Sequence, residues 1–427
     1  MAVHDCCGIT GCPVEKRKLE SICRYRNEAV FARDAKCEEY ISTESMVANR
    51  GGITLASSAP SDGKVKRYRK DDVLVSNIRP YFKKIWHASH DGACSNDVLV
   101  FEATKCDPSY LFWVLSSDAF FDYMMKTARG TKMPRGDKKA IMGYQVGLPS
   151  VDQQKAICEI LESLQEKVAL NNQLNGYLVE LINSEFAKRF DNHGPKTPLK
   201  NVLSISTKSL NPQQHVGEVW EHYSIPAFDA THWPTFELAD GIKSNKYAVD
   251  NNSILISKLN PSIKRMWVPA CLTDKAVCST EFIVYKPLES SHKSFYCAAI
   301  NAEEFTAFLL EHVTGSTGSR QRTQPKATHN YPMPNPSRIE IESFCAFADP
   351  IYQQIQANEI ESQRLRSLRD ALLPKLMSGE IDVSKVDLTQ LNSHLADCLV
   401  QPSPEGIPVF HKWPSADQPT EDQLDSP

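Results

Sequence analysis

The pattern of apolar residues in the first half of the chain predicts a mixed domain of strands and helix. Two short β-branched runs, residues 73–78 and 98–101, are bounded by Asp, Asn, Pro and Gly, which is typical of strands. Residues 110–125 carry apolar side chains at helical spacing and are expected to form a packed helix. These positions are Leu111, Val114, Leu115, Phe121 and Met124.

The same pattern returns later in the chain, which indicates an internal duplication. Residues 73–80 read Val-Leu-Val-Ser-Asn-Ile-Arg-Pro, and residues 254–261 read Ile-Leu-Ile-Ser-Lys-Leu-Asn-Pro, 181 positions further on. Residues 94–101 return as 278–285 at an offset of 184, and a second helix is expected over 295–313. Each copy is then a mixed α/β domain of about 150 residues, a normal domain size.

A long amphipathic segment follows each copy. In residues 152–190 the apolar positions alternate at spacings of four and three, which is the heptad pattern of a coiled coil, and residues 340–377 show the same alternation. A helix over 152–190 would be about 58 Å long, too long for the interior of a small domain. The two helices are therefore expected to pair with each other; the alternative is that each docks separately on its own domain.

Both predicted seams contain polar residues near the middle. These are Asn171 and Asn175 in the first seam, and Asn358 and Ser362 in the second. Buried polar residues in a seam lower stability but fix register, so we hypothesise that these four set it. An antiparallel pairing of Asn171 with Ser362 also matches Asn175 with Asn358, but a parallel pairing aligns them equally well. Topology favours the antiparallel pairing, because it places the similar domains at opposite ends.

The expected fold class is α/β (α+β): two similar mixed domains, separated and followed by long helices that pair as an antiparallel coiled coil. The predicted segments are a first domain (1–150), a first long helix (151–195), a second domain (196–338), a second long helix (339–380) and an acidic, Pro-containing tail of disordered composition (381–427). Pro374 is expected to interrupt the second helix near its end, with Gly379 as its stop.

Composition places the chain among soluble globular proteins. It is 41% hydrophobic and 23% charged, without an apolar run long enough to span a membrane or the basic and apolar regions of a secretory signal. An intracellular location with its 13 cysteines reduced is expected. The cluster of Cys6, Cys7, Cys12 and His4 suggests zinc, but no second pair follows at zinc-finger spacing, so unpaired thiols are favoured.

The net charge of −4 hides an uneven distribution. Residues 62–90 carry eight Lys/Arg against three Asp, and residues 126–139 carry six Lys/Arg against one Asp. The acidic end of the chain, residues 397–427, offsets both in the sum. Because local potential steers a polyanion to a surface, the total charge does not argue against nucleic-acid binding.

Motifs for catalysis are missing from the sequence. There is no phosphate-binding Gly-Lys-Ser/Thr loop and no Gly-rich dinucleotide or S-adenosylmethionine fingerprint. The run Asp-Pro-Ile-Tyr at 349–352 resembles the motif of amino-methylating DNA methyltransferases, but it lacks the second proline and lies in the helical seam. No nucleophile, base and orienting group come together, so the sequence predicts a binding protein without catalytic residues, metal or cofactor.

The basic, glycine-containing loops are the candidate binding elements. Glycine lets backbone approach a phosphate chain closely, Arg can hold guanine bidentately, and Lys acts as a phosphate counter-charge. For any single cation, a solvated surface charge is the alternative. The predicted DNA-binding residues are Arg79, Lys83, Lys84, Arg129, Lys132, Arg135, Lys258, Lys264, Arg265, Arg320, Arg322 and Lys326.

The chain resembles the specificity subunit of type I restriction–modification systems, and the resemblance covers most of residues 40–385. The matching segments are Tyr-Ile-Ser-Thr-Glu-Ser-Met (40–46), Asp-Val-Leu-Val-Ser-Asn-Ile-Arg-Pro-Tyr (72–81), Gly-Ala-Cys-Ser-Asn-Asp (92–97), Leu148-Pro149 with Gln153-Gln154, and Leu-Arg-Asp-Ala-Leu-Leu-Pro-Lys-Leu-Met-Ser-Gly-Glu (368–380). The second copy departs from the pattern, because no Glu-Gln follows Met333-Pro334.

The resemblance implies that each domain recognises one half of a split, asymmetric DNA sequence. It also implies that the paired helices set the gap and dock two methyltransferase subunits, to which restriction subunits are added. S-adenosylmethionine, ATP and Mg would be bound by those partners, in the prokaryotic cytoplasm, and this chain would contribute no catalysis. The competing interpretations are a self-sufficient nuclease–methylase, whose motifs are absent, and a two-domain scaffold unrelated to DNA.

Overall fold

The computed structural model describes residues 14–36, 39–56, 58–190, 194–315 and 321–383. Within these ranges the chain forms two compact units, one of residues up to 179 together with residues from 354 onward, the other of residues 180–353. We use "first domain" for residues 14–150 and "second domain" for residues 194–337. The predicted cysteine cluster near the N-terminus and the predicted tail beyond residue 383 lie outside the described residues.

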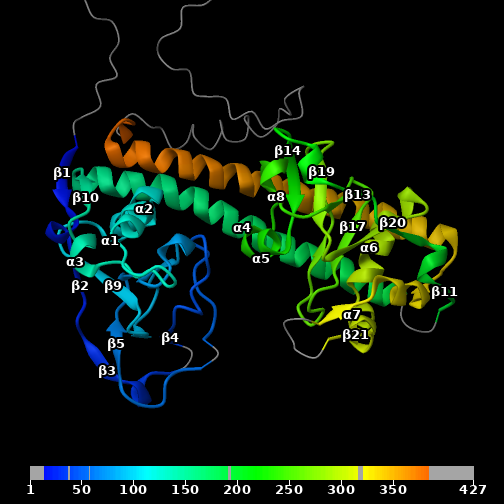
Figure 1. Ribbon diagram of the computed structural model, residues 1–427, viewed down its shortest axis with the longest axis horizontal. Coiled ribbons are helices and arrows are strands. Elements are labelled where there is room, and N and C mark those ends of the chain that lie inside the picture. The colour runs from blue at the N-terminus through cyan, green and yellow to red at the C-terminus, as the bar shows by residue number, and fades with distance from the viewer. Residues whose placement is uncertain (1–13, 37–38, 57, 191–193, 316–320, 384–427) are drawn as a thin grey trace, which may run out of the picture. The chain divides into compact units, whose positions relative to one another are not determined.

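The first domain stacks helices on two four-stranded sheets (Figure 1). One sheet has the order β2-β9-β6-β7, the other has the order β3-β5-β8-β4, and β1 pairs with β10 in a separate ribbon. The elements are β1 (Glu15–Lys18), β2 (Cys23–Tyr25), β3 (Ala29–Phe31), β4 (Tyr40–Ile41), β5 (Lys64–Tyr68), β6 (Val73–Ser76), β7 (Ile85–His87), β8 (Gly92–Cys94), β9 (Val98–Ala103), α1 (Pro108–Ser116), α2 (Asp118–Lys126), α3 (Lys138–Ile141) and β10 (Gln145–Leu148).

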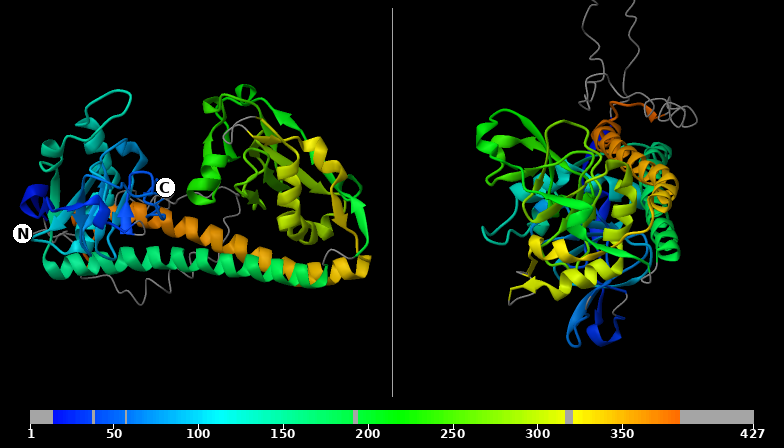
Figure 2. Two further views of the ribbon diagram at one scale, coloured as in Figure 1. Left: turned by 90° about the horizontal axis from the view of Figure 1, so that it is seen from below. Right: turned by 90° about the vertical axis from the view of Figure 1, so that its right-hand side faces the viewer.

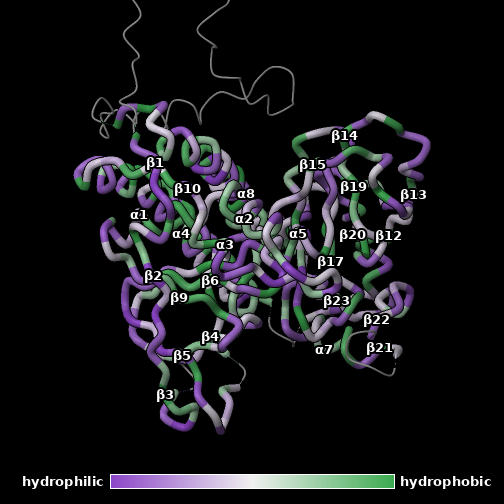
Figure 3. The backbone as a smooth tube through the Cα atoms, turned by 60° about the vertical axis from the view of Figure 1, so that its left-hand side comes forward, coloured by the Kyte–Doolittle hydropathy of each residue, from purple (hydrophilic) through white to green (hydrophobic). Residues whose placement is uncertain are grey.

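Strand β6 is buried on both faces, which explains its continuous apolar run. Its alternate side chains enter two different cores. Val73 and Val75 pack with the residues of α1 and α2, whereas Leu74 packs with Tyr68 and Ile41 of the other sheet. Figure 3 shows the apolar residues along β6 and its neighbour β9. The predicted strands are therefore the middle layer of a three-layer domain.

The second domain repeats this plan and adds to it. Its first sheet, β12-β20-β17-β18, has the same antiparallel order as β2-β9-β6-β7, and β11 pairs with β23 as β1 pairs with β10. Its other sheet, β13-β16-β19-β14-β15, contains one additional edge strand. The elements are β11 (Lys196–Pro198), β12 (Leu203–Ser206), β13 (Ser209–Leu210), β14 (Val219–Tyr223), α5 (Ile225–Thr231), β15 (Thr235–Leu238), β16 (Lys246–Ala248), β17 (Ile254–Ser257), β18 (Met266–Trp267), β19 (Ala276–Ser279), β20 (Phe282–Pro287), α6 (Lys293–Asn301), α7 (Glu303–Glu311), β21 (Val313–Thr314), β22 (Arg322–Thr323) and β23 (Pro332–Pro334).

The single helix predicted in each copy is in fact two helices. Ser117 interrupts the first prediction with an extended backbone, and its hydroxyl caps α2 by accepting a hydrogen bond from the Phe120 N–H. Ala302 interrupts the second prediction with nearly the same backbone angles. Apolar spacing continues across both breaks, which is why periodicity alone did not reveal them.

The two long helices are α4 (Val151–Arg189) and α8 (Arg338–Ser378), which lie side by side and run antiparallel (Figure 2). Asn171 contacts Ser362, and Phe186 contacts Phe344 further along α4 and nearer the start of α8. The expected antiparallel coiled coil is confirmed, and separate docking of each helix is excluded. The expected interruption at Pro374 was wrong, because α8 continues to Ser378 before Gly379 takes a φ of 75°.

Both long helices begin with the same reciprocal cap, although their residues differ. At α4 the Gln153 N–H donates to Ser150 Oγ, and the Ser150 N–H donates to Gln153 Oε1. At α8, Ser337 and Glu340 exchange the equivalent pair of bonds. The missing Glu-Gln after Met333-Pro334 therefore does not remove the helix cap.

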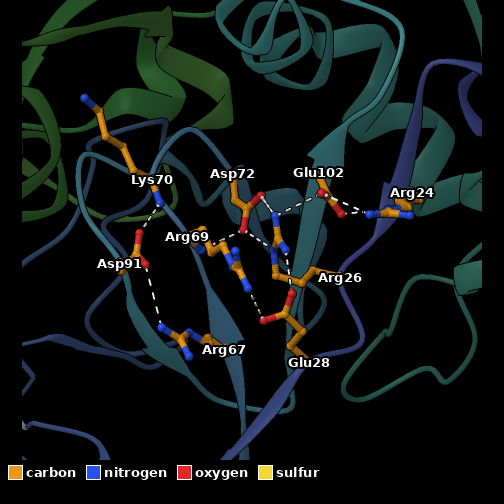
Figure 4. A network of polar contacts seen from close by, with 9 residues as sticks. All are labelled: Arg24, Arg26, Glu28, Arg67, Arg69, Lys70, Asp72, Asp91 and Glu102. Atoms are coloured by element: carbon orange, nitrogen blue, oxygen red, sulfur yellow. Dashed lines mark hydrogen bonds and ion pairs between the residues drawn. The ribbon is translucent and has the colours of Figure 1, made fainter.

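The two domains bury charge in different ways. In the first, Arg26 forms a two-bonded ion pair with Asp72 at 2.6 and 3.0 Å, with Glu28 and Glu102 also at the guanidinium (Figure 4). In the second, Glu221 is fully buried, and the hydrogen-bond donors that the described residues offer it are uncharged. These donors are the Tyr223 hydroxyl, the N–H groups of Leu272 and Thr273, and the Thr273 hydroxyl.

Candidate nucleic-acid interface

A basic loop of the first domain is fixed to the end of β6 by backbone hydrogen bonds. Arg129 and Arg135 close the loop by exchanging N–H···O bonds of 2.8 and 2.9 Å. Arg135 also forms a β-bridge with Ile78, and the Arg79 N–H donates to the Pro134 carbonyl at 2.8 Å. The structure therefore brings Arg79, which follows β6, next to the loop that carries Arg129 and Arg135.

These cations differ in how far they are already neutralised. Arg79 and Lys132 are exposed, and neither side chain has an ion-pair or hydrogen-bond partner among the described residues. Arg129 reaches Asp137 at 2.6 Å, and Arg135 lies 3.3 Å from Asp97. The backbone N–H of Ala140, that of Lys139 and the Arg129 charge hold the pKa of Asp137 below its ordinary value.

Lys83 and Lys84 belong to the scaffold more than to the open surface. Lys83 Nζ lies 2.6 Å from Asp118, and Lys84 Nζ donates to the Thr43 carbonyl at 2.6 Å. Burial lowers the pKa of the Lys84 ammonium. Arg50, which the sequence did not single out, also pairs with Asp118.

The basic region at residues 62–90 is likewise less open than its sequence suggests. Arg69 pairs with Glu28 at 3.0 Å and Arg67 lies 3.8 Å from Asp91, beside the buried Arg26–Asp72 pair (Figure 4). Exposed ion pairs of this kind contribute little stability, but they reduce the local excess of positive charge. The loop at 129–136 is the stronger candidate for contact with a polyanion.

The second domain holds its basic segment by the same backbone bonds. Arg322 forms a β-bridge with Leu259, and the Asn260 N–H donates to the Gln321 carbonyl at 2.9 Å. Asn260 has a φ of 48°, and its counterpart Arg79 has a φ of 49°. Arg322 is therefore the structural equivalent of Arg135, and Asn260 is the equivalent of Arg79.

The predicted cations of the second domain also fall into two groups. Lys258 and Lys326 have no side-chain partner within the described part of the chain, and Lys326 is exposed. Arg265, by contrast, is buried and bonded twice to Asp229, at 2.6 and 2.9 Å. Lys264 donates to the Asn301 carbonyl. Arg320 lies outside the described residues.

An acidic residue stands beside the equivalent arginine in both domains. Asp97 lies 3.3 Å from Arg135, and Glu281 accepts two bonds from Arg322, at 3.0 and 3.2 Å. Sequence reasoning missed these acids, although the offset of 184 already placed Asp97 opposite Glu281. A carboxylate in this position fixes the direction of a guanidinium, which is useful for a bidentate contact.

The polar residues predicted in the coiled-coil seam meet in pairs. Asn171 Nδ2 donates to Ser362 Oγ at 3.3 Å and to Glu361 Oε2 at 2.6 Å. Asn358 Nδ2 donates to Asn175 Oδ1 at 2.7 Å. Asn171, Asn358 and Ser362 are buried. Their role in setting the register stays a prediction.

Helix α4 also carries apolar side chains outside the seam. Leu170, Leu174 and Tyr177 are 61%, 43% and 57% exposed, and their spacing of four and three places them along one side of the helix. This exposed stripe is a candidate surface for another protein.

Other kinds of site are absent from the described residues. These residues contain no group of three or more His, Cys, Asp or Glu side chains arranged to hold a metal ion. No helix in the described part of the chain is both long and apolar enough to cross a membrane. The arrangement of buried backbone supports and exposed cations is that of a binding surface.

The fold thus combines a duplicated α/β domain with a basic segment and a long paired helix after each copy. The family described as the type I restriction modification DNA specificity domain matches residues 13–178. The chain therefore resembles the specificity subunits of type I restriction–modification systems, and residues 13–178 carry the family match.

Relatives of the same family match over larger parts of the chain. The type I restriction enzyme HindI specificity subunit of Haemophilus influenzae is 21% identical over 77% of this chain and 90% of its own length. The MjaIX specificity subunit of Methanocaldococcus jannaschii is 24% identical over 65% of this chain and 70% of its own length.

A solved structure shares the fold. The S subunit of a type I restriction–modification system from M. genitalium matches with a TM-score of 0.52 and 15% identity, over 85% of this chain and 96% of that one.

Proposed function

We propose that this chain recognises a DNA sequence made of two separated parts, and that each domain reads one part. The observation that carries the proposal is the pair of equivalent basic segments, built on the same backbone bonds but with different side chains. Arg79 corresponds to Asn260, and Asn77 corresponds to Lys258. A shared framework with different polar groups suits two readers of different sequences.

The cations divide into two expected roles. Arg79, Lys132, Lys258 and Lys326 are not held by acids and would bind phosphates, which supplies affinity and a steep dependence on salt. Arg135 and Arg322 are oriented by acids and are the better candidates for base edges. Arg265 is left out of the proposed interface because it is buried against Asp229, whereas the Arg322 side chain remains 42% exposed.

The paired helices would fix the gap between the two half-sites. Inserting one heptad into both α4 and α8 should lengthen the required gap, because the readers follow the helices. Sequencing the modified sites in cells that carry the variant system would measure the gap. An unchanged gap would contradict this role for the helices.

The chain would act without catalysis of its own, as the DNA-recognition subunit of a larger assembly. We propose that two methyltransferase subunits dock on the coiled coil, partly through Leu170, Leu174 and Tyr177, and that restriction subunits join them. S-adenosylmethionine, ATP and Mg would then be bound by the partners. We also propose the prokaryotic cytoplasm as its location, where the DNA target is accessible.

Selection from a random pool of duplexes by the full-length chain tests the proposal. We expect a two-part motif. Arg135→Ala should relax one half and Arg322→Ala the other, each costing about 1–3 kcal/mol at the affected base pair. Arg320→Ala, from the same predicted loop, is expected to affect the same half as Arg322→Ala. If each variant lost the same affinity for every DNA sequence, these arginines would contact phosphates only.

A further inference from the structure

Each domain ends its central buried strand in a tight turn that exposes apolar side chains. In the first domain the turn is Pro80–Phe82, and in the second it is residues 261–263. Each turn is entered through a left-handed residue, and its closing N–H donates back to that residue's carbonyl. The bonds are Phe82 N–H to Arg79 O and Ile263 N–H to Asn260 O, both 3.0 Å.

The left-handed backbone is strained for residues other than glycine, and the surrounding structure must hold it. In both domains it is held from one side by the basic segment, through the bond to Pro134 or to Gln321. In the first domain Lys83 also has a positive φ of 49°. The same strained turn is therefore present twice, and strain of this kind often marks a functional site.

The tips of these turns expose large apolar side chains to solvent. Tyr81 is 47% exposed, Phe82 is 38% exposed, and Ile263, the equivalent of Phe82, is 48% exposed. The Tyr81 and Phe82 rings lie 4.6 Å apart, centre to centre. A single exposed apolar residue would need no explanation, but an apolar residue at the same tip of two duplicated turns calls for one.

The lysine that follows each tip is turned back into its own domain. Lys83 pairs with Asp118, and Lys264 donates to the Asn301 carbonyl. Each ammonium is thereby held by a partner, although Lys264 stays exposed, and in the first domain Arg79 beside the tip is exposed as well. The first tip therefore lies at the border of a cationic surface, and the second lies next to Lys264.

We infer that Tyr81, Phe82 and Ile263 contact the bases of bound DNA. The inference rests on the proposed function and adds a second kind of contact to it. Apolar side chains next to phosphate-binding cations contact thymine methyl groups or insert at base steps. Because they neutralise no phosphate, they contribute sequence preference without adding to the salt dependence.

Binding of the full-length chain to the duplex selected by the wild type tests the inference. The variants are Tyr81→Ala with Phe82→Ala, and Ile263→Ala. We expect each to lower affinity about tenfold, the size of one lost base-pair contact. The slope of log affinity against log salt should stay unchanged, and repeated selection should show the loss in one half of the motif for the first variant and in the other half for the second.

Matched controls separate this result from a loss of folding. Phe31→Ala and Leu288→Ala remove exposed apolar side chains from the same domains but outside the turns, and they should not change affinity. Phe82→Leu keeps an apolar tip and should retain most of the affinity. Unchanged binding by the turn variants, or an equal loss on unselected duplexes, would overturn the inference. If the wild type selected no motif at all, the proposed function itself would fail.

Discussion

The two domains share a backbone framework but stabilise their interiors with different polar chemistry. Both use the same four-stranded sheet, the same left-handed turn and the same bridge to a basic segment. The first domain buries the Arg26–Asp72 ion pair. The second also holds a buried arginine, Arg265, against Asp229, but in addition it buries Glu221 among uncharged donors. Apolar strands and backbone bonds are therefore shared by the two domains, while buried polar groups differ.

The largest expected contrast comes from neutralising the buried acids. Asp72→Asn leaves the Arg26 guanidinium buried without its main counter-charge and should destabilise the chain by about 3 kcal/mol. Glu221→Gln should be tolerated, because an amide oxygen can accept the same N–H bonds and its NH2 group can donate to Tyr223. Denaturant unfolding at neutral pH would measure both. Similar losses of stability in the two variants would show that the two buried acids have equivalent roles.

The effect of the Glu221→Gln substitution on stability should also depend on pH. Burial raises the pKa of Glu221 above its ordinary value, so its charged form destabilises the folded state. Glu221 therefore stabilises the folded state most at pH values below the pKa that its carboxyl has in the unfolded chain. This stabilisation is lost as the pH rises through the higher pKa that the carboxyl has in the folded chain. The stability of Glu221→Gln relative to the wild type should increase from acidic to neutral pH, which thermal midpoints at several pH values would show. If the two thermal midpoints differed by the same amount at every pH, the Glu221 carboxyl would not be destabilised by its burial.

A smaller contrast concerns the acids beside the two equivalent arginines. Asp97→Asn and Glu281→Gln remove the charge that orients Arg135 and Arg322 but leave the arginines in place. We expect each to relax one half of the recognised sequence by about 1 kcal/mol, since a less fixed guanidinium discriminates less well. The Glu281 variant should show the larger effect, because that pair has two bonds. Selection from a pool of duplexes measures this loss of base preference. If either variant instead became more selective, the acids would not be orienting the arginines for base contacts.

The smallest expected effect concerns the open lysines. Lys132→Ala and Lys326→Ala should each reduce the salt slope by about 0.9, the contribution of one phosphate contact, without changing the selected motif. Binding titrations over a range of salt concentrations would detect this. Lys84→Ala is the matched control, since its ammonium is bonded to Thr43 and should leave the slope unaltered. If either variant selected a different DNA motif, the substituted lysine would contact bases and not only phosphates.

The parts of the fold that depend on local periodicity could be predicted from the sequence. The strands at Val73–Ser76 and Val98–Ala103 and both long helices follow from spacing within short windows, and the duplication follows from the return of whole segments 181 to 184 residues later. The breaks at Ser117 and Ala302 could not, because apolar spacing continues across them.

The candidate site was less predictable, because it depends on contacts between distant segments. Arg265 resembles any surface cation in the sequence, and only folding brings Asp229, 36 residues away, to its guanidinium. Asp97 reaches Arg135 across 38 residues in the same way. The basic composition of a segment therefore does not show which of its charges remain open.

The end of helix α8 has a consequence for how the chain is made. Leu373, Leu376 and Val383 belong to the core of the first domain, together with Val146 and Ile157. A Cβ atom on Gly147 would lie 2.6 Å from the Met377 carbonyl oxygen, so that strand and helix end meet closely. During synthesis, this domain therefore lacks part of its interior until more than two hundred further residues have been added. Folding of that domain should be completed late, and a chain that stops early should leave an apolar gap for chaperones and proteases to find.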